Sequence, residues 1–194
     1  IVFIHIAGVE MLNISAVVNS LGPSQKSFYL IKEFNKSREN TDISASVFYE
    51  RPAIPVTPIL FSCRNVSFFS DYEGIAFATK LEDASTLLKT CNNAVKCLYL
   101  WDIDWLTSSI NYRPACDILH DQRLNLIARS ESHATIIQNF CNRKCAAIID
   151  NWNLEQIIDF HDEYMKKEQE KEEKRRERIR RRLEQMNKAK EQNV

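Results

Sequence analysis

Two aspartates stand one residue apart in the string Trp101-Asp102-Ile103-Asp104-Trp105, directly after an apolar run. Two carboxylates at this spacing can bind a divalent ion that neutralises a diphosphate, or one of them can take a proton from a hydroxyl group as a general base. We therefore treat Asp102 and Asp104 as candidate catalytic residues. In the simpler interpretation of this common pattern, both side chains cap a turn and face water.

A second candidate site is the string Arg129-Ser130-Glu131-Ser132-His133, at a predicted junction between a strand and a helix. The free amide groups and the dipole at the start of a helix favour an anion. Arg129 and His133 could join these amides, so we expect Arg129, Ser130 and His133 to bind a ligand. The alternative is an N-cap serine followed by an exposed first turn.

Several well-known chemical motifs are missing. The stretch from Gly8 to Asn13 has one glycine where the dinucleotide fingerprint G-x-G-x-x-G has three, which disfavours a nicotinamide or flavin enzyme. There is no G-x-x-x-x-G-K-S/T and no G-x-S-x-G, which disfavours a Walker-type NTPase and an α/β-hydrolase. The six cysteines form no C-x-x-C pair, so we expect reduced thiols and no metal site.

The elements that must position these residues alternate between short apolar runs and helical patterns. A loop is expected from Gly8 through Gly22-Pro23, and a short strand is expected at 66–69. Helix starts are predicted at Ser24, at a capping box formed by Thr79 and Glu82, at Ser130, and at Asn153. Strands are predicted at 1–7, 43–49, 74–78, 97–101, 124–128 and 145–149.

This alternation predicts right-handed crossovers, and hence an α/β fold with a doubly wound, mainly parallel, Rossmann-like sheet over residues 1–160. In such sheets, ligands lie beyond the carboxyl ends of the strands. This rule adds four candidate ligand-binding residues to those above: Gly8, Asn13, Thr79 and Asn151. For Gly8, an ordinary turn glycine is the alternative.

The last part of the chain has a different composition. Residues 162–194 hold 12 Lys or Arg against 9 Asp or Glu, in a chain of 194 residues whose net charge is zero. We predict a charged helix over 161–194, supported by i, i+4 pairs such as Glu172/Arg176 and Glu177/Arg181. Its basic run at 174–182 could bind nucleic acid or an anionic membrane surface; a solvated helix that pairs with a partner is the simpler alternative.

Four strings resemble the amino-terminal Rossmann half of GT-B glycosyltransferases, and most nearly the glycosyltransferase-like proteins of tailed marine phages: GIAFAT at 74–79, CLYLWDIDW at 97–105, LIARSESH at 126–133 and IIDNWN at 148–153. The resemblance covers residues 1–160. It implies a module that receives the acceptor, with a nucleotide-sugar donor held by a second Rossmann half. Where that half should begin, the charged helix begins instead. The resemblance therefore implies a module that is incomplete without a donor-domain partner.

Two alternatives stay open. A GT-A glycosyltransferase also carries a metal-binding D-x-D, although continued strand-helix alternation through 124–149 favours GT-B. A non-catalytic protein would instead use the α/β body and the charged helix to join an assembly. No apolar run reaches the ~20 residues that span a bilayer, and no signal peptide is recognised. We therefore expect a cytoplasmic protein, in the host cytoplasm or the virion if phage-encoded.

Overall fold

The computed structural model describes residues 11–69, 72–90, 93–102 and 112–191. The chain divides into two compact units, Ile1–Ile157 and Ile158–Val194. The first unit carries a sheet and the helices around it, and the second carries most of the last helix. The strand expected at 1–7 lies outside the described residues.

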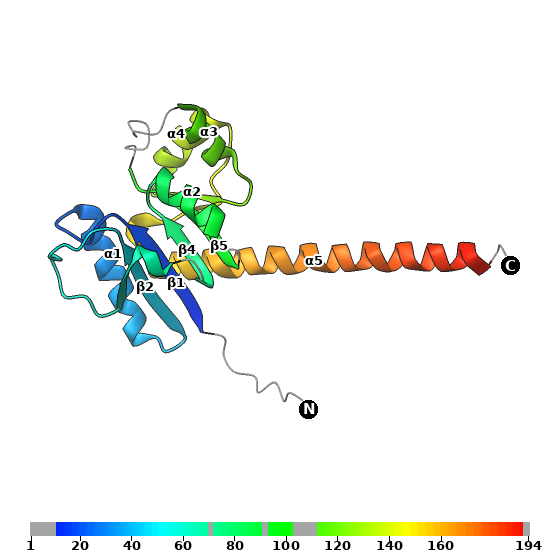
Figure 1. Cartoon of the computed structure of the whole chain (residues 1–194), viewed down its shortest axis with the longest axis horizontal. Coiled ribbons are helices and arrows are strands. Elements are labelled where there is room, and N and C mark those ends of the chain that lie inside the picture. The colour runs from blue at the N-terminus through cyan, green and yellow to red at the C-terminus, as the bar shows by residue number, and fades with distance from the viewer. Residues whose placement is uncertain (1–10, 70–71, 91–92, 103–111, 192–194) are drawn as a thin grey trace. The chain divides into compact units, whose positions relative to one another are not determined.

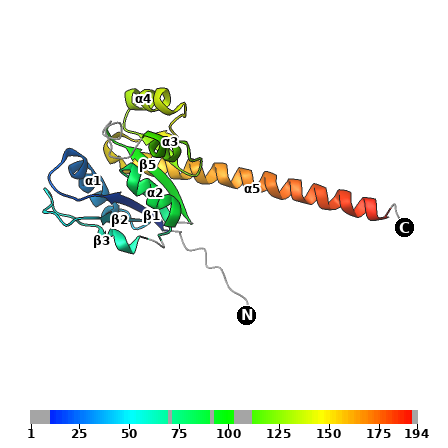
Figure 2. The ribbon, with the colours of Figure 1, turned by 45° about the horizontal axis from the view of Figure 1, so that its top comes forward.

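The first unit contains a seven-stranded sheet in which every pair of neighbouring strands is parallel (Figure 1). The strand order is β3-β2-β1-β4-β5-β6-β7, and Figure 2 shows β3, β2 and β1 side by side. This order is that of a doubly wound Rossmann-like fold, so the predicted fold class is confirmed. The strands are β1 Leu12–Val18, β2 Ile43–Tyr49, β3 Ser62–Asn65, β4 Gly74–Ala78, β5 Ala94–Leu100, β6 Asn125–Ala128 and β7 Ala147–Ile148.

The helices follow the strands as crossovers. They are α1 Gln25–Asn35, α2 Leu81–Thr90, α3 Tyr112–His120, α4 Glu131–Cys141 and α5 Leu154–Glu191, with short 3-10 helices at Lys36–Glu39, Val66–Phe68 and Asp150–Trp152. Ser24 accepts a hydrogen bond from the Ser27 amide at 3.0 Å, and the Asn153 side chain accepts one from the Gln156 amide at 3.0 Å. The helix starts predicted at Ser24 and Asn153 are therefore confirmed.

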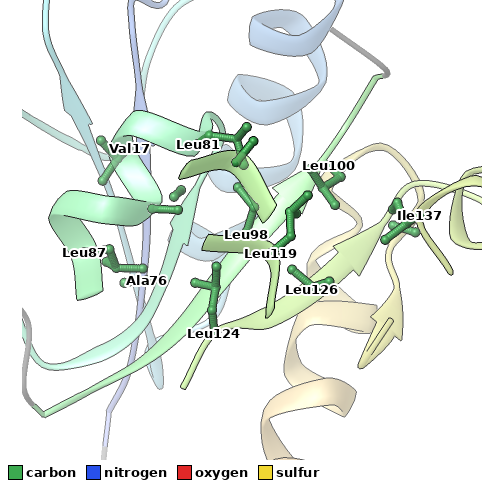
Figure 3. Close-up of a cluster of buried hydrophobic side chains, with 14 of the residues drawn as sticks. Val17, Ala76, Leu81, Leu87, Leu98, Leu100, Leu119, Leu124, Leu126 and Ile137 are labelled. Atoms are coloured by element: carbon green, nitrogen blue, oxygen red, sulfur yellow. The ribbon is translucent and has the colours of Figure 1, made fainter. Parts of the chain in front are cut away.

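Buried apolar side chains cover both faces of the sheet. Ala76 and Ala78 of β4 belong to a buried cluster that also holds side chains of α2, α3 and α4 (Figure 3). The alternate residue Phe77 is buried on the opposite face, where its ring lies 5.8 Å from that of Trp152. This two-residue alternation between apolar layers is typical of a parallel sheet covered on both sides.

Several local predictions were wrong. β1 occupies Leu12–Val18, within the expected loop. The predicted strand at 66–69 is a 3-10 helix over Val66–Phe68, and the neighbouring strand is β3. The expected capping box at Thr79 does not form: the Thr79 hydroxyl donates to the Val17 carbonyl at 2.9 Å, and α2 begins at Leu81.

The second unit is the helical segment of α5 from Ile158 onward, and α5 is drawn as one continuous helix in Figure 1. Arg176 pairs with Glu172 at 3.2 Å and Arg181 pairs with Glu177 at 2.5 Å, as the i, i+4 spacing predicted. Exposed pairs of this kind contribute about 0.2 to 0.5 kcal/mol each. Among the described helices, none is long and apolar enough to cross a membrane.

Candidate functional site

The strand order reverses between β1 and β4, and the loops that leave the carboxyl ends of these strands define the expected ligand edge. We call this the carboxyl edge: residues 19–24 after β1, 50–51 after β2, 79–80 after β4, 101–102 after β5 and 129–130 after β6. At the switch between the two halves, the Thr79 hydroxyl ties the end of β4 to the Val17 carbonyl in β1. Thr79 thus lies at the carboxyl edge as predicted.

Asp102 follows β5 at this edge and lies beside a cation that the sequence analysis missed. The Lys26 ammonium, in the first turn of α1, is 3.7 Å from Asp102 Oδ2. The two side chains are 29% and 37% exposed, so both reach solvent. A solvent-accessible carboxylate next to an ammonium can accept a hydroxyl proton while the ammonium attracts an anion.

Arg129 and Trp101 place a second cation at the carboxyl edge. The Arg129 guanidinium lies 4.9 Å from the centroid of the Trp101 ring, in cation–π geometry. Such a contact contributes about 0.5 to 2 kcal/mol and holds the planar group in one orientation. Trp101 is itself buried, and its ring packs 6.0 Å from that of Tyr29 in α1. The ring contacts therefore connect Arg129 to the helix that also carries Lys26.

Ser130 and His133 form the start of α4. Ser130 is the N-cap, and its hydroxyl accepts a hydrogen bond from the His133 amide at 3.4 Å. The His133 ring is half-buried, and its Nδ1 is a buried atom without a hydrogen-bond partner in the described part of the chain. The side chain of Ser130 thus serves as the cap, as in the simpler interpretation. Arg129 and Ser130 lie at the carboxyl edge, and His133 lies beside them in the first turn of α4.

A group of charged side chains around the end of β2 was not predicted. The Lys80 ammonium lies 3.7 Å from Glu50 Oε2, and both side chains are more than one third exposed. Asp83, in the first turn of α2, is 6% exposed, and its Oδ2 accepts no hydrogen bond from a described residue. These three residues bring two carboxyl groups and one ammonium group together at the switch between the sheet halves.

The pKa of Asp83 is raised from its ordinary value of 3.8 to about 7. Burial is the largest cause, and the negative charge of Glu50 is the next; Lys80 opposes the shift, while Glu82 and a hydrogen bond to Glu50 add to it. Burial disfavours the charged form of a carboxyl, and a neighbouring negative charge does the same. A carboxyl that titrates near neutral pH can serve as either a proton donor or a proton acceptor.

The two predicted ligand-binding asparagines lie at opposite ends of the sheet. Asn151 follows β7 and so lies at the carboxyl ends of the strands. Asn13 is the second residue of β1 and lies at the amino end of the sheet, because β1 occupies residues that were expected to form a loop. Its carbonyl oxygen packs against Gly74, the first residue of β4. Asn151 has φ 47° in the 3-10 turn before α5, where asparagine accommodates left-handed backbone. Gly8 and Asp104 lie outside the described residues.

Lys26, Glu50, Lys80 and Asp83 are charged residues at or beside the carboxyl edge that sequence reasoning missed. Glu50 and Lys80 could have been found from the ends of the predicted strands at 43–49 and 74–78, since they follow these strands within two residues. Lys26 and Asp83 have no such signal, because they lie in the first turns of helices, 76 and 33 residues from their partners Asp102 and Glu50. Only the folded crossovers bring these pairs together.

The described residues contain no group of three or more His, Cys, Asp or Glu side chains that could hold a metal ion. Burial raises the pKa of the Cys63 and Cys145 thiols to about 11, which keeps both protonated and unreactive at neutral pH. Among the described residues, the carboxyl edge and its surroundings offer carboxylates, cations and the first turns of the helices.

Comparisons with known proteins do not assign a family. No protein-family model matches this chain, and searches of curated proteins and of solved structures found no similar protein.

Proposed function

We propose that the α/β body binds a nucleotide sugar or its sugar acceptor at the carboxyl edge, as the GT-B resemblance implies. The observation that carries this proposal is the arrangement around Asp102. Its carboxylate lies 3.7 Å from the Lys26 ammonium, and Arg129 is held over the adjacent Trp101 ring. One carboxylate and two cations thus gather at the ends of β5 and β6 and at the start of α1.

Each of these groups has a role in the proposed module. The Asp102 carboxylate accepts a hydrogen bond from a sugar hydroxyl and can take its proton. Lys26 and Arg129 offset the negative charge of a phosphate group, with the first turn of α4 nearby. Complete glycosyl transfer also needs a donor-binding half, which this proposal assigns to a partner outside these 194 residues.

The all-parallel sheet favours this assignment over the GT-A alternative, because the strand-helix alternation continues through β6, α4 and β7. The order of the strands places the carboxyl ends of β1 and β4 at the switch between the two sheet halves. That position is where open α/β sheets bind their ligands.

Isothermal titration of the full chain with nucleotide sugars and with free sugars tests the proposal. We expect saturable binding of at least one of the two classes. Lys26→Gln should weaken binding of a phosphate-bearing ligand by about tenfold, which corresponds to one lost charge-assisted hydrogen bond of about 1.4 kcal/mol. Lys32→Gln is the matched control, because Lys32 lies in the last turn of the same helix and is exposed.

Equal effects of the two lysine substitutions would contradict the proposed role of the carboxyl edge. The absence of saturable binding to both ligand classes would refute the proposal as a whole. In that case the alternative function, a non-catalytic protein that joins an assembly, is the better account. The observation that favours this alternative is the pair Ile179 and Leu183 in α5, whose side chains are 49% and 55% exposed.

A further inference from the structure

Five cations lie on one side of α5. Lys171, Lys174, Arg175, Arg178 and Arg182 line one side of the helix together with Ile179. We call these five cations the basic stripe. All of them are exposed, and consecutive members are one, three or four residues apart. The basic stripe spans twelve residues, and the eleven steps between its ends cover about 16 Å at 1.5 Å per residue.

The opposite face of the same segment carries both signs of charge, because Arg176 and Arg180 lie there beside glutamates, and Glu184 and Glu177 pair with Arg180 and Arg181. With about 100° between consecutive residues, Glu173, Glu177 and Glu184 point roughly away from the centre of the basic stripe. Their side chains are exposed as well. Residues 171–184 hold eight Lys or Arg against four Glu, and the excess positive charge lies on the face of the basic stripe.

Only part of the basic stripe is neutralised within the helix. Lys171 pairs with Glu168 at 2.6 Å and Arg175 pairs with Glu172 at 3.7 Å. Among the described residues, Lys174, Arg178 and Arg182 have no carboxylate within ion-pair distance. Three cations on one face are thus available to an external anion.

We propose that the basic stripe binds the phosphate backbone of double-stranded nucleic acid. A duplex carries one negative charge per about 1.7 Å of its axis, so a 16 Å stripe lies against roughly ten phosphates. An α-helix about 10 to 12 Å in diameter fits the major groove, which is about 12 Å wide. The face with both signs of charge turns away from the duplex, which fixes the rotation of the helix about its own axis.

The composition of this segment argues against two other anionic surfaces. Residues 165–185 contain no aromatic side chain, and single-stranded nucleic acid is bound mainly by stacking of bases on aromatic rings. Helices that insert into a membrane surface need a broad apolar face, whereas Ile179 and Leu183 are the exposed apolar side chains between 171 and 185. Phosphate contacts alone predict binding that does not depend on base sequence.

The experiment measures binding of the full chain to a labelled, mixed-sequence DNA duplex by fluorescence anisotropy over a series of salt concentrations. Five phosphate contacts predict a slope of log K against log salt of about −4 to −5. The triple variant K174Q/R178Q/R182Q should reduce the size of this slope by about 2 to 3 and weaken binding at low salt at least tenfold.

The matched control is K166Q/R176Q/R180Q, which removes three cations from the other side of α5 and changes the net charge equally. It should keep the slope of the unmodified protein. Glutamine has a helix propensity close to those of Lys and Arg, and circular dichroism checks that helicity is retained in both variants.

Three results would overturn the proposal. The first is equal weakening by the two triple variants, which would indicate attraction by net charge alone. The second is a slope of log K against log salt near zero for the unmodified protein. This result needs no variant, so it stays decisive even if a variant loses its helix. The third is binding to vesicles of an anionic phospholipid, or to single strands, that is tighter than binding to the duplex. The assay does not involve the carboxyl edge, so its outcome is independent of the proposed function.

Discussion

Replacing Asp83 by asparagine should make the protein more stable, and the gain should grow with pH. Asp83 is buried, its Oδ2 accepts no hydrogen bond from a described residue, and its pKa in the folded protein is raised from 3.8 to about 7. Below pH 3.8 the carboxyl is protonated in both the folded and the unfolded chain. Between pH 3.8 and 7 it is protonated only when folded, so the folded state loses stability as the pH rises through this range to about 7.

The size of the effect follows from these two pKa values. One pKa unit corresponds to 1.36 kcal/mol, so the titration of Asp83 lowers the free energy of unfolding by about 2 to 3 kcal/mol between about pH 5 and pH 8. The asparagine side chain of the variant carries no charge at either pH and has a similar shape. The difference in unfolding free energy between Asp83→Asn and the unmodified protein should therefore increase by that amount over this range.

Urea denaturation of both proteins at the two pH values measures this difference. Asp117→Asn is a control on an exposed carboxylate in α3 and should change the unfolding free energy by less than about 0.5 kcal/mol. Glu50→Gln should lower the pKa of Asp83, because the negative charge of Glu50 is the second cause of its raised value. The loss of stability on titration of Asp83 should then occur at a lower pH. Parallel pH curves for Asp83→Asn and the unmodified protein would refute this reasoning.

Three further substitutions test the fold. Gly74→Ala should lower the unfolding free energy by about 2 to 5 kcal/mol in urea denaturation. Gly74 has φ +118°, and a Cβ there would lie 2.3 Å from the Asn13 carbonyl oxygen. A loss of unfolding free energy below about 1 kcal/mol would contradict this. Tyr99→Phe should lower the unfolding free energy by about 1 to 3 kcal/mol, since the buried hydroxyl donates to the Ile149 carbonyl, and an unchanged melting temperature would count against that contact. Arg143→Lys should lower the unfolding free energy by about 1 to 3 kcal/mol in the same assay, because the guanidinium donates to three backbone carbonyls around the α3–β6 connection. If an Arg-to-Lys substitution at an exposed position lowers the unfolding free energy equally, these hydrogen bonds do not stabilise the fold.

The parts of the fold that the sequence predicted well are those with a simple apolar pattern. The bounds of β2 and β4 match the predicted strands at 43–49 and 74–78, because both strands are short, rich in apolar residues and followed by polar residues. β1 was missed because Asn13 and Ser15 interrupt its apolar run. Ser15 is nevertheless fully buried, and its hydroxyl donates to the Ile75 carbonyl at 3.3 Å. A polar side chain that is satisfied inside a sheet does not show in a hydropathy pattern.

The candidate site was predictable only where it depends on the end of a strand. Arg129 and Asp102 follow β6 and β5, so the strand pattern placed both at the carboxyl edge. Asn13 was misplaced because it was expected in a loop that leaves the carboxyl end of a strand. It is instead the second residue of β1, so it lies at the other end of the sheet. The partner of Asp102 was not predictable, since Lys26 reaches it only through the packing of α1 on the sheet.

Chemical-shift mapping by NMR tests the central claim, which is that a ligand binds at the carboxyl edge. Isotope-labelled full chain is titrated with a nucleotide sugar while the backbone amide signals are followed. We expect the largest shifts at Ser20, Thr79, Asp102 and Arg129, and none at Gly74 on the amino side of the sheet. Shifts confined to the amino ends of the strands or to α5, or no shifts at saturating ligand, would contradict the account.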